Sequence, residues 1–455
     1  MVSVFFSFLI KIFFVSSSGD DDNDNDDDGQ QQANNDDDNT NDNNSNNNYG
    51  GVDQNQLSTF LLTFSGELFF MVFLPPIMFN SGYELKRELF FRHLKPIVSF
   101  AVVGTAVSGM VTGLCMYGLS SLLGGWMGED AVEMNLFEFL TFGSLITATD
   151  TVSVLGVLNA KKVNPHLFSL VFGESALNDA VAIVLFQSYS RLVRMGGIEN
   201  QQSLVHEISS FVTVFLLDIV GCPIMGMIFA FVSALVFKHV DFYGTPILEL
   251  SLYILIIYFP FIVAEVLGMS GIVTIFFTGI FARRYIEPNI SEETKHNAEV
   301  IFSLVAYLAE VCIFINLGLS VFGFQGSFHW AFIGCAFLAS LIGRAMSIYP
   351  ISFFSNFLDK IIPSKFMHFL WFAGLRGAVA YACARDFPNV HGNKDEVIAA
   401  TMVIVFFSVI VMGAFCDPLL KILNIQMGVD NQEYMKEWRN RRSLDGRIHQ
   451  LGMYW

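Results

Sequence analysis

The sequence has few charged residues and long stretches with none at all. Only 15% of its 455 residues are Asp, Glu, Lys or Arg, whereas soluble domains have about 25%. Hydrophobic residues make up 53% of the chain, and short polar loops separate long apolar runs. This pattern excludes an ordinary soluble enzyme and predicts an all-α polytopic membrane protein.

Cysteine is also scarce, and no two cysteines have the CxxC spacing of a metal or redox site. Most lie inside apolar runs, so we interpret them as small packing residues. They are Cys115, Cys222, Cys312, Cys335, Cys383 and Cys416. We expect no cofactor. The net charge of −17 comes largely from one acidic tract, and we expect no nucleic-acid partner.

The N-terminal part of the chain differs from the rest. Residues 1–16 are apolar but short for a membrane span, and they fit a signal peptide, a signal anchor or a helix remnant equally well. Residues 17–56 are rich in Asp, Asn and Gln and have almost no apolar side chains, which predicts disorder. We expect a transmembrane domain over 57–424 and a short tail over 425–455.

Eleven apolar segments follow the acidic tract. They are approximately 57–82, 96–123, 136–160, 166–190, 206–237, 247–267, 269–285, 299–323, 328–357, 366–385 and 397–424. Basic residues gather in alternate loops, beginning with Lys86, Arg87, Arg92 and Lys95 and then Lys161 and Lys162. The positive-inside rule predicts that these loops and the C-terminus are cytosolic, and that the acidic tract is outside or luminal.

Two of these segments contain carboxylates where a lipid-facing helix should have none. Asp150 lies in one, and Glu174 and Asp179 lie in the next. An ionisable group near the bilayer centre costs roughly 3 kcal/mol, so such groups face a bundle interior and mark ion or proton pathways. We therefore expect the rest of the chain to be built around residues 142–186.

Asp179 is the main candidate for a carrier of cations and protons. Burial disfavours the charged form of a carboxylate, so a carboxylate in a partly hydrated cavity can exchange a proton for a cation near neutral pH. Asn178 is neutral, so the pair has one titratable charge. Helix capping is the structural alternative for this pair.

Thr149-Asp150-Thr151 predicts a helix break inside an apolar segment, because Thr and Asp compete for backbone hydrogen bonds. Broken helices expose carbonyls and helix ends that line ion sites at the membrane midplane. Asp150 either binds the ion or holds the broken ends.

Arg376 is a lone cation in an apolar stretch and needs a partner. We predict that it forms a structural ion pair with Glu174, which lies on a different helix face from Asp179. Arg344 is a second intramembrane cation, without an assigned partner, and is a candidate for the access path.

Two further acids lie near or within the predicted spans. Glu310 lies deep in its segment and is also a candidate for the access path. Glu265 is close to Gly268, which indicates a helix end at the interface, so we assign it no role in transport.

Two other classes of protein are alternatives to a transporter. Gly268-Met269-Ser270-Gly271 fits the pattern of an intramembrane serine protease, with His329 or His368 as base. That reading leaves the intramembrane charges unexplained. A passive cation channel would need a selectivity constriction, and no segment resembles one.

Four motifs resemble those of the sodium/proton exchanger family of cation–proton antiporters. They are Phe73-Leu74-Pro75-Pro76-Ile77, Ala148-Thr149-Asp150, Phe172-Gly173-Glu174-Ser175-Ala176-Leu177-Asn178-Asp179-Ala180 and Gly374-Leu375-Arg376-Gly377-Ala378. Their order and spacing match over about residues 57–430. Gly343-Arg344-Ala345, Ile348-Tyr349-Pro350 and Met427-Gly428-Val429-Asp430 resemble the endosomal branch of the family, which includes organellar members.

The resemblance implies an inverted-repeat antiporter fold with a dimerisation domain and a core domain of crossing broken helices. It implies that Asp179 binds Na⁺ or K⁺, with Asn178, Ser175, Thr149 and Asp150 around it. It also implies electroneutral one-for-one exchange with H⁺ by alternating access, because Asn-Asp replaces the Asp-Asp pair of electrogenic relatives. We thus expect a homodimeric antiporter, not an enzyme, in an endosomal or other organellar membrane.

Three features depart from the family pattern. Thr151 follows Asp150 where many members have proline, which predicts a gentler break. Cys416-Asp417-Pro418 differs from the small and hydroxyl residues usual near that position. Residues 1–56 stand where the family usually has one or two full helices.

Overall fold

The computed structural model describes residues 69–85, 90, 93–127, 132, 134–194, 213, 215–240, 245–323, 328–359 and 362–429. Over these ranges the chain forms helices and loops, with one isolated β-bridge. Residues 1–56 and most of the predicted tail lie outside the described residues. The prediction of an all-α fold is confirmed for the described part of the chain.

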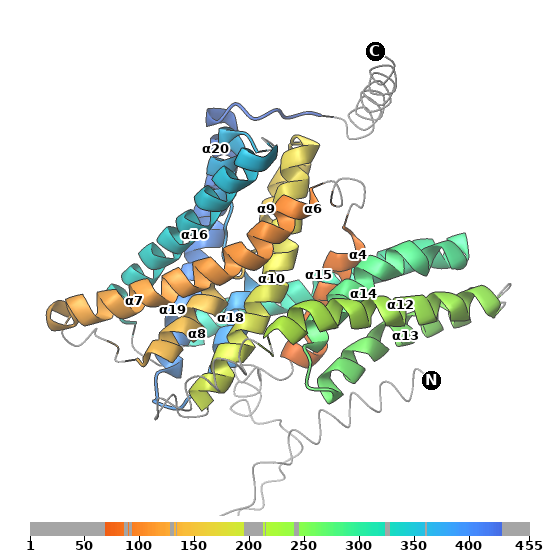
Figure 1. Ribbon diagram of the computed structural model, residues 1–455, viewed down its shortest axis with the longest axis horizontal. Coiled ribbons are helices and arrows are strands. Elements are labelled where there is room, and N and C mark those ends of the chain that lie inside the picture. The colour runs from red at the N-terminus through yellow and green to blue at the C-terminus, as the bar shows by residue number, and fades with distance from the viewer. Residues whose placement is uncertain are drawn as a thin grey trace, which may run out of the picture. The chain divides into compact units, whose positions relative to one another are not determined.

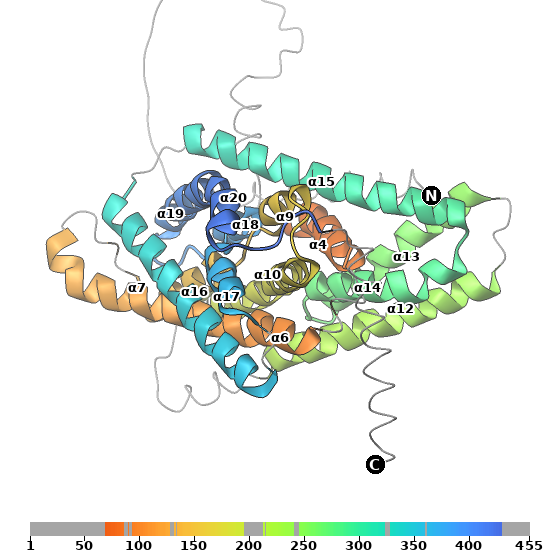
Figure 2. The same cartoon turned by 90° about the horizontal axis from the view of Figure 1, so that it is seen from above.

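Figures 1 and 2 show how the described helices are arranged. In chain order they are η1 (Phe69–Phe73), α4 (Leu74–Tyr83), α6 (Leu94–Val98), η2 (Ser99–Gly104), α7 (Thr105–Met127), α8 (Leu136–Ile146), α9 (Thr151–Ala160), α10 (Pro165–Arg194), η4 (Leu217–Gly221), α12 (Cys222–His239), α13 (Pro246–Val266), α14 (Gly271–Tyr285), η5 (Glu287–Asn289), α15 (Glu292–Gly323), α16 (Trp330–Asp359), α17 (Ser364–Phe372), α18 (Ala378–Arg385), α19 (Lys394–Phe407), η6 (Ser408–Met412) and α20 (Gly413–Ile422). η1, η2, η4 and η6 are π-helical turns that continue directly into neighbouring helices.

Each of the eleven predicted segments coincides with one, two or three consecutive helical elements, as far as the described residues extend. Seven helices in those ranges are long and apolar enough to cross a membrane. Two segments, 136–160 and 366–385, are each a pair of half-helices, α8 with α9 and α17 with α18. Interrupted helices are tolerated at membrane depth only where protein or a water-filled cavity surrounds the break.

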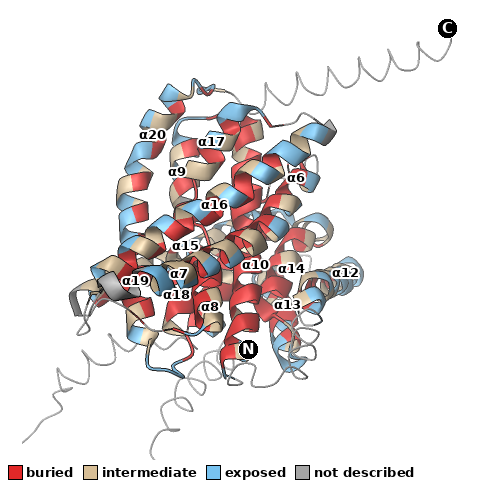
Figure 3. Ribbon diagram, turned by 60° about the vertical axis from the view of Figure 1, so that its left-hand side comes forward, coloured by how far each residue is buried: buried red, intermediate tan, exposed pale blue. Residues whose placement is uncertain are grey.

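Helix α10 lies in the middle of the helices seen from above, with α7 and α16 on one side and α15 on the other (Figure 2). Its surface is almost wholly covered (Figure 3), and 94% of its most apolar stretch is buried. The acidic residues of α10 therefore face other helices and not lipid, as the cost of an exposed intramembrane charge requires.

Contacts between residues near the helix ends show which ends lie on the same face of the protein. On one face Lys161 lies 3.1 Å from Asp417, and Lys365 donates to the carbonyl of Asn424 at 3.5 Å. We call this face the cytosolic face, because it carries the basic loops of the positive-inside prediction.

On the opposite face, which we call the luminal face, His391 lies 3.1 Å from Glu138. Arg194 lies 3.8 Å from Asp386 there. Helices α8 and α18 thus lie between the luminal face and the interior, and α9 and α17 lie between the cytosolic face and the interior.

Candidate functional site

The two interrupted helices cross at their breaks. The backbone N–H of Asp150 donates to the carbonyl of Leu375 at 2.7 Å, and Thr149 and Arg376 form an antiparallel bridge. Gly377 permits this approach, since a Cβ atom there would lie 3.0 Å from the Cα of Asp150. The break predicted at Thr149-Asp150 is confirmed, and Thr151 begins α9 directly after it.

Asp150 holds the broken end of α9. Its carboxylate accepts a hydrogen bond from the N–H of Ser153 at 3.3 Å and contacts the Ser153 hydroxyl. Both contacts are those of a helix N-cap, where a negative charge is stabilised by the helix dipole. Of the two roles left open by the sequence, helix capping is the one that this structure contains.

Arg376 holds the other broken end, that of α8. Its buried guanidinium donates to the carbonyl of Thr147 at 3.0 Å and to that of Ser340 at 3.4 Å. Thr147 directly follows α8, so the arginine places positive charge at the negative end of the half-helix dipole. The backbone N–H of Arg376 donates to the hydroxyl of Ser408 at 3.0 Å, which holds the break between α17 and α18 in place.

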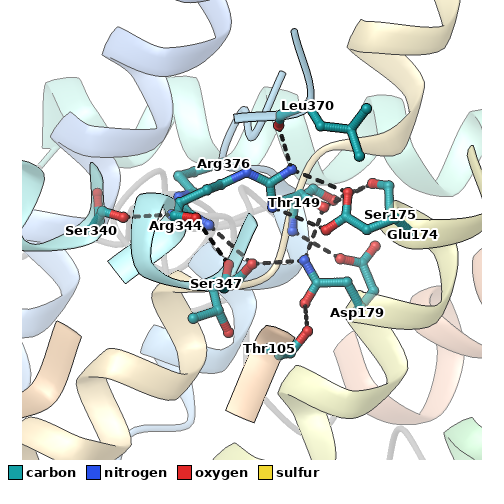
Figure 4. Close-up of polar contacts among 12 residues, drawn as sticks. Thr105, Thr149, Glu174, Ser175, Asp179, Ser340, Arg344, Ser347, Leu370 and Arg376 are labelled. Atoms are coloured by element: carbon teal, nitrogen blue, oxygen red, sulfur yellow. Dashed lines mark hydrogen bonds and ion pairs between the residues drawn. The ribbon is translucent and has the colours of Figure 1, made fainter. Parts of the chain in front are cut away.

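Asp179 lies on α10 beside the first break, with only 8% of its surface exposed. One carboxylate oxygen accepts the N–H of Thr149 at 3.0 Å. The hydroxyl groups of Thr149 and Ser175 lie 2.8 Å apart. The residues predicted to surround Asp179 are therefore brought together around the unwound backbone (Figure 4).

Asn178 holds the same unwound backbone from the other side. Its amide nitrogen donates to the carbonyl of Thr147 at 3.0 Å and to the hydroxyl of Thr149 at 3.2 Å. Its amide oxygen accepts the hydroxyl of Thr105 at 2.6 Å (Figure 4). Sequence reasoning missed Thr105, because a threonine within an apolar helix gives no signal of its partner.

The predicted ion pair between Glu174 and Arg376 is wrong. Glu174 instead accepts two hydrogen bonds from Arg344, at 3.0 and 3.1 Å, and Arg344 also donates to the carbonyl of Leu370 at 2.9 Å (Figure 4). Gly374 makes room for this pair, since a Cβ there would lie 2.1 Å from the Nε atom of Arg344. Gly374, two residues before Arg376, therefore makes room for the side chain of Arg344.

Arg344 is consequently a buried residue held in an ion pair with Glu174, and its place on an access path stays a prediction. The carboxylate of Glu174 and the carbonyl of Leu370 provide acceptors for both terminal nitrogens of the guanidinium group, as a buried charge requires, while its Nε atom has no acceptor among the described residues. Arg376, by contrast, has no carboxylate within 4.0 Å among the described residues and is held by carbonyl groups.

Glu310, on α15, is half-buried and lies close enough to Asp150 and Asp179 for their charges to interact. This position agrees with its predicted place on an access path. Glu265 accepts the N–H of Gly271 at 3.0 Å in the turn between α13 and α14, where Gly268 has a φ of +72°. It lies at a helix end, as predicted.

Ser270 does not form a protease site in this structure. Its backbone N–H donates to Asp218 at 3.0 Å, and it precedes the first residue of α14. No histidine contacts it among the described residues, whereas a serine nucleophile needs a base within hydrogen-bond reach. His368, one of the two suggested bases, contacts Tyr349.

The chemistry that the site offers is oxygen coordination around a single carboxylate. Asp179 and the hydroxyl groups of Thr149 and Ser175 are hard oxygen donors, which suit hard cations. Among the described residues, no group of three His, Cys, Asp or Glu side chains could hold a metal ion. Crossed, interrupted helices around a buried carboxylate are an arrangement of secondary transporters.

Comparison with known proteins agrees with this class. The sequence profile described as sodium/hydrogen exchanger, transmembrane, matches residues 50–422. Sodium/hydrogen exchanger 8 of Homo sapiens is 37% identical over 369 residues, which are 80% of this chain and 61% of that protein. Sodium/hydrogen exchanger 9 of Rattus norvegicus is 39% identical over 382 residues, 83% of this chain and 58% of that protein. The chain belongs to the sodium/hydrogen exchanger family.

The chain spans about three fifths of the length of these relatives. Among solved structures, it is similar to the sodium proton antiporter MjNhaP1 from Methanocaldococcus jannaschii, with a TM-score of 0.60 and 18% sequence identity. That match covers 81% of this chain and 92% of the other. The predicted antiporter fold is confirmed.

Proposed function

We propose that this protein exchanges Na⁺ or K⁺ for H⁺ across a membrane, one for one, with Asp179 as the shared carrier. The observation that supports this proposal is that the carboxylates of Asp150, Glu174 and Asp179 have different partners. Asp150 caps α9, and Glu174 is paired with Arg344. Asp179 has no cation within 4.0 Å among the described residues and accepts one N–H only. It is the carboxylate whose charge a bound cation or proton would neutralise.

Exchange follows from competition at Asp179. A cation bound to the carboxylate and to the hydroxyl groups of Thr149 and Ser175 neutralises the buried negative charge. A proton on the carboxylate neutralises the same charge, so the two ions compete for one site. Asn178 adds no titratable charge, and its amide groups hold the broken backbone. Each half-cycle then moves one positive charge, so the complete cycle is electroneutral.

Alternating access would expose Asp179 to one face and then to the other. In related folds the site stays at the midplane while one bundle rocks against another. Glu310 would line the route to the cytosolic face. The family resemblance further supports a homodimer in an endosomal or other organellar membrane, with lipid around it and the C-terminus in the cytosol.

A transport assay tests the proposal. Purified protein is reconstituted in acid-loaded proteoliposomes, and proton efflux is recorded after Na⁺ or K⁺ is added outside. Cation-dependent efflux that saturates and leaves no net current supports the antiporter. Cation conductance without linked proton flux would support a passive channel instead. Comparison of the two cations decides which one is preferred.

A further inference from the structure

Three buried polar side chains join α15 to the half-helix α18. The hydroxyl of Tyr381 donates to the amide oxygen of Asn316 at 3.1 Å. It also lies 2.7 Å from the hydroxyl of Ser320. Because tyrosine has only one hydroxyl proton, Ser320 is the donor in that second contact. Tyr381, Asn316 and Ser320 are 1%, 6% and 8% exposed.

This cluster lies on the luminal side of Asp179. Tyr381 is in the first turn of α18, which begins at the crossing and ends near the luminal pair of Arg194 and Asp386. Asn316 follows Glu310 by six residues along α15, which is about 9 Å toward the luminal end of that helix. The cluster therefore stands between the cation site and the lumen.

On the opposite side of the site, the polar residues along α15 are less buried than this cluster. Ser303 lies on α15 between Glu310 and the cytosolic end of that helix. Its hydroxyl donates to the carboxylate of Glu84 at 3.0 Å, and Glu84 is exposed on the cytosolic face. Glu310 lies between Ser303 and the site and is half-buried. The polar residues between the site and the cytosolic face are thus half-buried or exposed, whereas Tyr381, Asn316 and Ser320 are buried and hydrogen-bonded to one another.

The cluster also joins two parts of the fold with different neighbours. Helix α15 packs along α4 and α13, while α18 packs on α8 and α19 near the crossing. Buried hydrogen bonds between two such parts stabilise one arrangement of them, because separation leaves polar groups without partners unless water enters. A motion that opens the luminal side must break these bonds.

We propose that Tyr381, Asn316 and Ser320 form a luminal latch that stabilises the cytosol-facing state. The latch rests on the proposed exchange function, in which the site alternates between the two faces. Tyr381 is a positioning residue in this scheme, because it acts on the balance between the two states and does not touch the cation. A substitution that shifts the equilibrium from the cytosol-facing state to the lumen-facing state makes the site more accessible from the lumen and less accessible from the cytosol.

Cys383 provides a direct readout of the latch. It lies two residues beyond Tyr381 on α18, with 1% of its surface exposed. In a variant that keeps only this cysteine, a membrane-impermeant maleimide applied from the luminal side should label it slowly. Tyr381→Phe keeps the ring and removes a hydroxyl that takes part in two hydrogen bonds. Labelling should become at least about fivefold faster, because the loss of one typical hydrogen bond already shifts an equilibrium by about that factor.

Tyr349→Phe is the matched control, because that hydroxyl contacts His368 at 3.0 Å and lies outside the cluster. Exchange is then measured in proteoliposomes in which all protein molecules have the same orientation. Tyr381→Phe should lower the luminal KM for the cation and raise the cytosolic KM, so that the ratio of the two KM values shifts about fivefold. A merely structural role would leave this ratio unchanged.

Each outcome decides one proposal. Unchanged luminal labelling of Cys383 in Tyr381→Phe would overturn the latch, and so would equal acceleration in Tyr349→Phe. A wild-type protein without exchange activity would refute the proposed function, while labelling would still decide whether the latch closes the luminal side.

Discussion

Glu174 and Arg344 form a buried, bidentate ion pair, with N–O distances of 3.0 and 3.1 Å. The pair joins the carrier helix α10 to α16, and it neutralises the acid that lies five residues before Asp179. Because Glu174 is compensated and Asp150 caps a helix, Asp179 is the one of these three acids that has neither role. The pair therefore makes the single-carrier proposal possible.

The ion pair predicts a specific pattern of stability. Removal of one partner leaves the other buried and unpaired, at a cost of about 3–5 kcal/mol. Glu174→Gln and Arg344→Met should each lower the thermal midpoint in detergent, and the double variant should recover part of the loss. Glu174→Gln combined with Glu249→Gln is the control, because Glu249 is a buried acid bonded to Ser291 and Thr294 and not to this ion pair, and those two losses should add. Strict additivity for Glu174 and Arg344 would contradict the pairing.

Asp179→Asn should abolish exchange and leave the fold intact. The amide keeps the volume of the carboxylate and can still accept the N–H of Thr149, but it neither titrates nor attracts a cation. Proton efflux from proteoliposomes and the thermal midpoint should be measured together. Exchange at wild-type rates in this variant would refute the assignment of the carrier.

Exchange should be indifferent to membrane voltage. One carboxylate that carries either a cation or a proton moves no net charge in a complete cycle. Efflux should therefore be the same with and without a diffusion potential, set with an ion that is not transported. Marked acceleration by an inside-negative potential would indicate a second titrating group, and Asp150 and Glu310 would be the first to replace with amides.

The sequence predicted most of the residues that the structure brings together at the crossing, but not every contact among them. Asp150, Asn178 and Asp179 were predictable, because a polar group in an apolar segment is costly and needs a function. The break at Thr149 was predictable for the same reason. These signals are local, and each can be read within a few residues.

The partner of Glu174 was not predictable, because Arg344 and Arg376 are both lone cations in apolar helices and only the packing chooses between them. The carbonyl of Thr147 is a second example. It accepts hydrogen bonds from Asn178 and Arg376, yet a carbonyl becomes available only where a helix ends, and sequence alone places helix ends poorly.

Thr105→Val tests how the Asn178 amide is held. The substitution removes the hydroxyl that donates to the amide oxygen at 2.6 Å, and a buried acceptor left without its partner costs about 1–3 kcal/mol. We expect the amide to reorient, which would weaken its hydrogen bonds to the carbonyl of Thr147 and the hydroxyl of Thr149. The broken backbone that donates to Asp179 would then be less well ordered, so the KM for the cation should rise.

The matched control for this substitution is Thr112→Val, on the same helix α7. Its hydroxyl is also buried, but it makes only a long contact of 3.5 Å with the carbonyl of Ala339 and lies away from the carrier. It should lower stability to a similar or smaller degree with no change in KM. An equal rise in KM in both variants would mean that α7 packing, and not the orientation of Asn178, controls cation binding.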